Sequence, residues 1–131
     1  MPALMVAKGR EITTSRIKGN GTEPKYLHWG TGATAPVDGN TALQTPRNEA
    51  RVAGTSSIVT KTTTNDTYRV VGTLTAASAA AITEAALFDV AGTGTPPING
   101  NLFIRGTFPV INLETGDSVQ FTIDGSLKAP V

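Results

Sequence analysis

Near the C-terminus, alternating apolar and polar residues place the strongest constraint on the fold. Between Asp117 and Leu127, apolar side chains at positions 119, 121 and 123 alternate with polar ones. A period of two residues predicts a β-strand that buries one face and exposes the other. We expect Val119, Phe121, Ile123 and Leu127 to face a hydrophobic core.

Several other segments have the character of strands, whereas helix signals are few. Alternation predicts strands over residues 67–75 and 101–108, and the content of Val, Ile, Ser and Thr over 51–64 suits a strand with polar ends. A weaker pattern suggests strands over 11–18 and 25–29. The alanine-rich stretch over 76–87 has helix propensity. It is short and leads directly into Leu87-Phe88, so we expect a turn over 76–81 and a strand over 82–90.

Turn-forming residues separate these segments at regular intervals. Gly, Asn, Asp and Pro cluster at 19–21, 38–40, 65–66, 92–101 and 115–117. Short strands with such punctuation predict an all-β fold, an antiparallel β-sandwich or jelly-roll-like single domain with an extended N-terminal arm. Three regions are expected: an arm with the first strands over 1–29, an extended connector over 30–46, and a main sandwich body over 47–131.

Composition limits the classes of function. The formal net charge of +1 is too small for a protein that binds nucleic acid by neutralising phosphates. The chain has no cysteine, which excludes disulfides and thiolate-bound metals. No apolar run approaches the roughly 18 residues of a membrane span, and no basic segment marks a secretory signal. With 5% aromatic residues the core is expected to be thin, which favours oligomerisation or docking on a larger body.

Residues suited to catalysis do not form a recognisable set. His28 is the single histidine, and its place beside Trp29 favours a hydrogen-bonded structural role over that of a general base. Glu84 stands in an apolar strand and needs a partner if it is buried. Arg105 is the candidate partner in an ion pair, with a catalytic acid as the alternative role for Glu84. We predict no catalytic, cofactor-binding or metal-binding residues.

Four pieces of the sequence, taken in order, carry a resemblance to a family. Trp29–Thr45, Ala81–Asp89, Asn101–Phe108 and Thr115–Ile123 resemble small β-rich virion structural proteins of tailed bacteriophages. The likeness covers about residues 29–127, leaves out the first 28, and departs from the family at Ala85-Ala86, where relatives often have a glycine. It implies a structural part of a phage particle, such as a capsid decoration (cement) protein or a component of a tail or head fibre.

We therefore expect a capsid decoration protein that lies on the outer capsid surface and bridges neighbouring major capsid subunits. We do not expect an enzyme. The expected partners are the major capsid protein and copies of the chain itself, as a homotrimer, without nucleic acid or membrane. Residues 1–24 and the connector are the expected attachment surface, the arm adding a strand to a capsid sheet. The candidate contact residues are Leu4, Val6, Arg10, Ile12, Trp29, Pro36 and Leu43.

Two alternatives remain open. One is a structural component of a tail or head fibre. The other is a carbohydrate-binding jelly-roll module, for which Trp29, Tyr26 and Tyr68 are the aromatic side chains available to stack on sugar rings.

Overall fold

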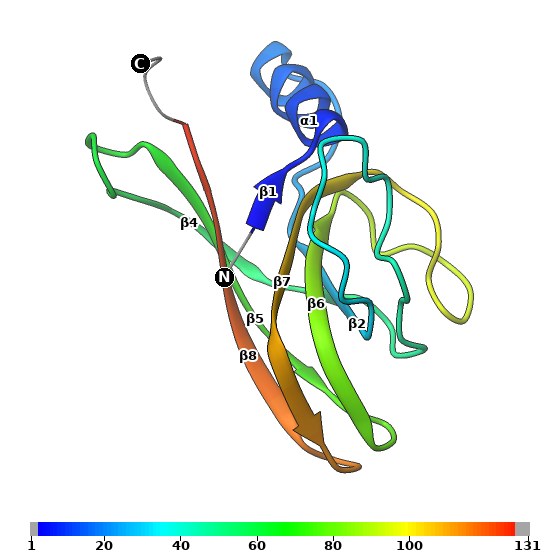
Figure 1. Cartoon of the computed structure of the whole chain (residues 1–131). Helices are drawn as coiled ribbons and strands as arrows, with labels where there is room; N and C mark the ends of the chain where they lie inside the picture. The colour runs from blue at the N-terminus through cyan, green and yellow to red at the C-terminus, as the bar shows by residue number, and fades with distance from the viewer. Residues whose placement is uncertain (1–2, 128–131) are drawn as a thin grey trace.

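The computed structural model describes residues 3–127 and contains two antiparallel sheets that pack face to face (Figure 1). One sheet has five strands in the order β1-β7-β6-β2-β3, and the other has three in the order β4-β5-β8. This confirms the predicted all-β sandwich. The elements are β1 (Ala3–Met5), α1 (Ala7–Lys18), β2 (Tyr26–Gly30), β3 (Val52–Ala53), β4 (Thr55–Val59), β5 (Thr67–Thr75), β6 (Ala80–Phe88), β7 (Leu102–Leu113) and β8 (Ser118–Ser126).

The sandwich is closed at one end and open at the other. Two short connections, from β5 to β6 and from β7 to β8, join the sheets at the lower end of Figure 1. Toward the upper end the hairpin of β4 and β5 diverges from β1 and α1. The sheets therefore separate into two lobes at this end of the molecule.

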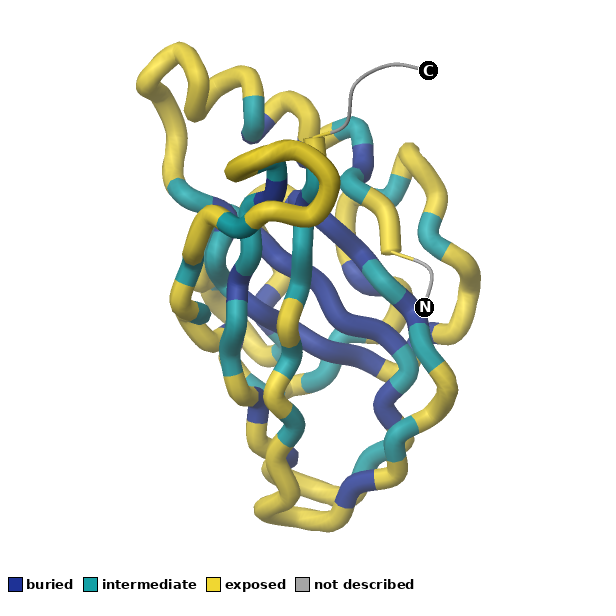
Figure 2. Tube along the Cα trace, turned by 90° about the vertical axis from the view of Figure 1, so that its left-hand side faces the viewer, coloured by how far each residue is buried: buried dark blue, intermediate teal, exposed yellow. Residues whose placement is uncertain are grey.

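Both faces of the five-stranded sheet are covered. Its inner face packs on the three-stranded sheet through a core that includes Leu27, Trp29 and Leu87. A second cluster, which includes Leu43, Ala86 and Phe88, lies beneath the connector. Burial on both sides explains why β6 is apolar over several consecutive residues. Figure 2 shows these central strands buried and the surrounding loops exposed.

The strand predicted over residues 11–18 is wrong, because this segment belongs to helix α1. The helix buries only Gly9 and Ile12, so it lacks the broad apolar stripe by which a helix is recognised. Gly19 ends it in a left-handed conformation with φ of 92°, and its N–H donates to the carbonyl oxygen of Arg16.

The prediction of an extended N-terminal arm is also wrong for the described residues, because residues 3–29 contribute two strands and a helix that pack with the rest of the chain. Before α1, β1 pairs with β7 of the same chain, where Leu4 lies opposite Arg105. After the helix, β2 lies between β6 and β3 within the five-stranded sheet. The first strand is thus part of the five-stranded sheet, where it pairs with β7 on one side and forms the edge on the other.

Most other predicted strands are present. Residues 25–29, 67–75, 82–90 and 101–108 correspond to β2, β5, β6 and β7, and the 51–64 segment holds β3 and β4. In β8 the predicted inward residues Val119, Phe121 and Ile123 pack against the core. Leu127 does not, because it lies beyond the end of β8 and is 61% exposed.

Candidate functional site

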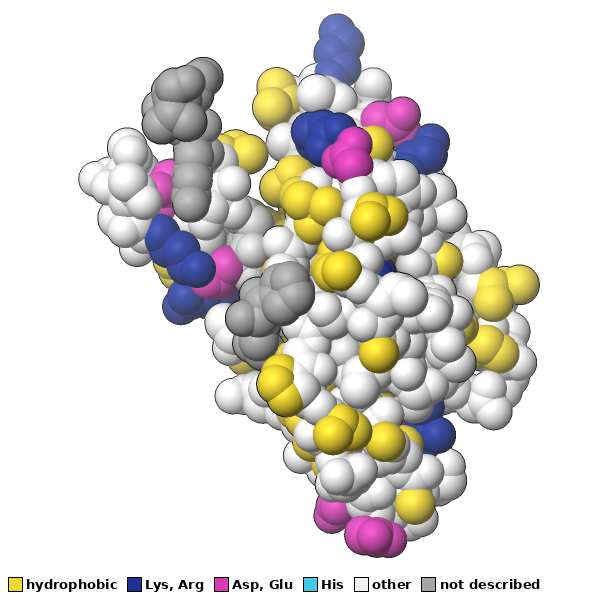
Figure 3. All heavy atoms as spheres, in the orientation of Figure 1, with side chains coloured by type: hydrophobic (Ala, Val, Ile, Leu, Met, Phe, Trp, Pro, Cys, Tyr) yellow, Lys and Arg dark blue, Asp and Glu magenta, His cyan; other side chains and the backbone are white. Residues whose placement is uncertain are grey.

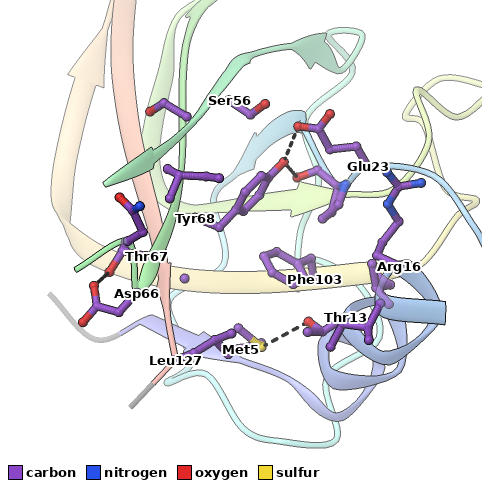
Figure 4. Close-up of a pocket in the computed structure, with 17 residues that line it drawn as sticks. Met5, Thr13, Arg16, Glu23, Ser56, Asp66, Thr67, Tyr68, Phe103 and Leu127 are labelled. Carbon is purple, nitrogen blue, oxygen red and sulfur yellow. Dashed lines mark hydrogen bonds between the residues drawn. The ribbon is translucent and has the colours of Figure 1, made fainter. Parts of the chain in front are cut away.

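A groove with a volume of about 740 Å³ opens between the two lobes at the upper end of the sandwich (Figures 3 and 4). Residues of β1 and α1, with the loop that follows the helix, line one side, and residues of β4, β5 and β8 line the other. Its volume lies within the range of about 300–1,000 Å³ that is typical of ligand pockets. We call this feature the apolar groove, after the side chains described next.

The inner wall of the apolar groove is built from core residues. Tyr68 and Phe103 meet edge to face, with ring centroids 5.9 Å apart. Met5 and Ile12 continue the apolar wall from β1 and α1. Because the strands and the helix hold these side chains, the wall is formed before any partner binds.

The rim of the groove exposes large apolar side chains. Ile17 is 80% exposed, Ile58 is 70% exposed and Leu127 is 61% exposed. The three come from α1, β4 and the residue after β8, so they surround the opening from both lobes. Exposed apolar side chains gathered around one concavity are typical of an interaction surface.

Polar groups around the groove are used within the fold. The Tyr68 hydroxyl donates to Glu23 Oε1 at 3.1 Å, and burial, followed by the nearby Glu23 charge, raises the pKa of Tyr68. Asp66 accepts backbone N–H bonds from Lys61, Thr62 and Thr63, and these bonds hold its pKa well below its usual range. The groove therefore offers a partner mainly apolar surface.

The ion pair predicted between Glu84 and Arg105 is present and deeply buried. Arg105 Nε donates to Glu84 Oε1 at 2.9 Å, and the two side chains are 1% and 0% exposed. The Glu84 carboxylate also accepts three backbone N–H bonds from the connector, from Gly32 at 2.9 Å, Gln44 at 2.9 Å and Thr45 at 2.8 Å. Glu84 thus joins β6, β7 and the connector at one point.

These bonds correct the picture of an extended connector over 30–46. The loop folds back on itself, since the Thr31 N–H donates to the Thr45 carbonyl at 3.0 Å and Gly30 bridges to Pro46. Leu43 then packs into the cluster beneath the loop. The connector is a folded cover on the outer face of the five-stranded sheet.

His28 takes the structural position predicted for it. Its imidazole is fully buried, and Nε2 lies 2.9 Å from the Arg47 carbonyl oxygen and 3.1 Å from that of Glu49. Burial lowers the pKa of His28. The imidazole has no opening to solvent through which a substrate could reach it.

The sequence did not predict the role of Glu49, which connects the segment after the connector to β2 and to the turn between β5 and β6. Its carboxylate accepts bonds from Trp29 Nε1 at 3.1 Å, Arg47 Nη2 at 2.8 Å and the Ala77 N–H at 3.0 Å. Burial alone would raise the pKa of Glu49, but these donors outweigh it and lower the pKa to about 2. No local pattern marks Glu49, because its partners are spread over three segments.

The seven candidate contact residues divide into two groups by burial. Val6, Trp29 and Leu43 are 0%, 0% and 5% exposed and do not line the groove, so their assignment as partner contacts is wrong. Ile12 is 7% exposed and contributes to the wall of the apolar groove. All four are core side chains of this chain. Leu4, Arg10 and Pro36 are at least partly exposed, and Arg10 is bound to Asp38 at 2.7 Å. The burial of Trp29 also removes the main aromatic platform proposed for a sugar.

Comparisons of the chain with protein-family models, with curated proteins and with solved structures give no match. In the part of the chain that the structure describes, no helix is long and apolar enough to cross a membrane. Over the same residues, the His, Asp and Glu side chains form no group of three or more that could hold a metal ion.

Proposed function

We propose that this protein is a virion structural protein that decorates the outer surface of a phage capsid and bridges neighbouring major capsid subunits. The sequence resemblance supports this role, since its four pieces contribute to strands β6, β7 and β8 and to the connector. The single observation that carries the proposal is the apolar groove, whose rim exposes Ile17, Ile58 and Leu127.

The proposed occupant of the groove is an uncharged apolar segment that projects from a major capsid subunit. Glu23 and Asp66 at the groove are already engaged by hydrogen bonds within the chain, and Arg16 donates to the Gly21 carbonyl at 3.0 Å. A charged segment would find little to pair with, whereas an apolar one would cover the exposed rim.

Decoration of this kind stabilises a shell by mass action. A protein that binds the assembled shell, and not its separated subunits, shifts the equilibrium toward the assembled form. Each copy that touches two subunits at once gains from the high effective concentration of the second contact. Many modest apolar contacts can then hold a particle together without any single strong site.

A pair of matched isoleucine variants tests the proposal. Ile58 is 70% exposed at the groove, and Ile98 is 76% exposed in the loop between β6 and β7, away from it. We expect Ile58→Asp to weaken binding to shells of the capsid protein encoded in the same genome by about tenfold or more. We expect Ile98→Asp to bind like the wild type.

The readout is the number of copies bound per purified shell as the protein is titrated. Equal binding by wild type and Ile58→Asp would overturn the groove as the contact surface. Failure of the wild-type protein to bind shells, or density confined to the tail in electron cryomicroscopy of virions, would overturn the decoration role itself.

A further inference from the structure

The outer edge of β8 is a long strand edge with no partner among residues 3–127. β8 lies at the end of the order β4-β5-β8 and pairs with β5 alone, over nine residues from Ser118 to Ser126. The other edge strands are shorter, with three residues in β1, two in β3 and five in β4. The backbone N–H and C=O groups on the free side of β8 are therefore available to another strand.

The features by which proteins usually protect such edges are missing from β8. Its pairing with β5 runs without a bulge, and it contains neither proline nor lysine. Asp124 is its single charged residue, and Arg69 at 2.8 Å and Lys61 at 2.9 Å already bind this carboxylate. An edge this long and this regular favours strand addition.

The sequence of β8 is complementary to itself when read in the opposite direction. With Thr122 at the centre, Phe121 of one strand lies opposite Ile123 of the other on the inner face. On the outer face Gln120 lies opposite Asp124, so an amide donor meets a carboxylate. The outermost pairs are Ser118 with Ser126.

We propose that β8 pairs antiparallel with β8 of a second copy of this chain, about a two-fold axis at Thr122. The interface is isologous, since each copy contributes the same edge. The two three-stranded sheets then form one six-stranded sheet that runs through both molecules. This two-fold pair differs from the homotrimer expected from composition and family resemblance, and it does not depend on the proposed capsid role.

Burial at the same edge supports a second copy as the occupant. The inner side chains Val119, Phe121 and Ile123 are only partly buried in the single chain. Phe121 is held between Trp29 and Phe108, with ring centroids 6.3 Å and 5.7 Å away. An added strand that brings its own Phe121 and Ile123 would cover the remaining exposed side of this apolar row.

A single cysteine tests both the pairing and its register. The chain has no cysteine, and Thr122 is exposed on the outer face of β8. Directly opposed residues of antiparallel strands have Cα atoms about 4.5–5.5 Å apart, which suits a disulfide. We expect Thr122→Cys to form a disulfide-linked dimer on mild oxidation, as judged by denaturing electrophoresis without reductant.

Thr73→Cys is the matched control. Thr73 is exposed on the central strand β5, next to Gln120 in the register, but it does not lie at the free edge. We expect this variant to remain monomeric under the same oxidation. Native mass spectrometry of the wild-type protein should give the mass of two chains.

Three results would overturn the proposal. One is a wild-type mass of one chain or of three chains. Another is a Thr122→Cys variant whose thiol reacts with a small alkylating reagent but forms no linked dimer. The third is equal linkage of the Thr122→Cys and Thr73→Cys variants, which would indicate random collision rather than β8 pairing.

Discussion

At the scale of single residues, Glu84 connects three parts of the molecule, namely β6, β7 and the connector. It accepts bonds from Arg105 and from three backbone N–H groups of the connector. Glu84→Gln keeps the shape but leaves the buried Arg105 charge without its counter-ion. Breaking a buried pair by removing one partner costs about 3–5 kcal/mol, so we expect a loss of that size in the free energy of unfolding. Denaturant titration measures it.

A second substitution separates this effect from the general loss of a carboxylate. Glu11 forms an exposed ion pair with Lys8 at 2.9 Å, and its side chain is 66% exposed. Exposed pairs contribute little because water screens the charges. We expect Glu11→Gln to leave the unfolding midpoint unchanged. A Glu84→Gln protein as stable as wild type would refute the role of this ion pair in holding the connector.

The Glu84 pair could be predicted from sequence, whereas the partner contacts could not. A carboxylate inside an apolar strand needs a partner because an unpaired buried charge is costly, and the sequence places Arg105 in a second apolar strand. Trp29 and Leu43 carry no such signal, because an apolar side chain suits a core and an interface equally well. Only the tertiary structure decides between them, and it places both in the core.

At the scale of elements, α1 lies so close to β7 that the contact requires a glycine. A Cβ atom on Gly9 would collide with the backbone carbonyl of Phe103 and crowd Met5. Replacing glycine by alanine inside a helix usually stabilises it by about 1 kcal/mol. Here we expect Gly9→Ala to lower the free energy of unfolding by about 1–3 kcal/mol, because the helix must move away from the sheet.

Gly39→Ala is the matched control for this prediction. Gly39 lies in the connector, and a Cβ atom there would meet nothing within 4 Å. Its substitution should change thermal stability little. If Gly9→Ala unfolds at the same temperature as wild type or above it, the close packing of α1 on β7 is not as described.

The strands could be predicted from sequence and the helix could not, because only the strands bury enough residues to leave a periodic pattern. In β5 and β8 one face is buried along the strand, so the alternation is visible in the sequence itself. Helix α1 buries only Gly9 and Ile12, and threonines and isoleucines in the same stretch favour strands. The apolar groove escaped prediction too, because its lining comes from segments spread along the whole chain.

At the scale of the whole molecule, the groove and the free edge of β8 lie on different parts of the sandwich. The groove occupies the open end between the lobes, where β8 contributes Gly125 and is followed by Leu127. The proposed two-fold axis passes through Thr122, in the middle of β8. A β8 dimer would therefore carry two grooves, one from each copy, which suits a protein that bridges neighbouring subunits of a shell.

A dimer held by β8 makes thermal stability depend on protein concentration. Association stabilises the folded chains by mass action, so the Tm should rise by about 2–3 °C for each tenfold increase in concentration. Thr122→Lys sets two ammonium groups against each other across the two-fold axis and should abolish this dependence. Thr73→Lys adds the same charge to the same sheet face on β5 and should retain it. Scanning calorimetry over a hundredfold range of protein concentration measures this dependence. A wild-type Tm that does not change over that range would contradict the β8 dimer.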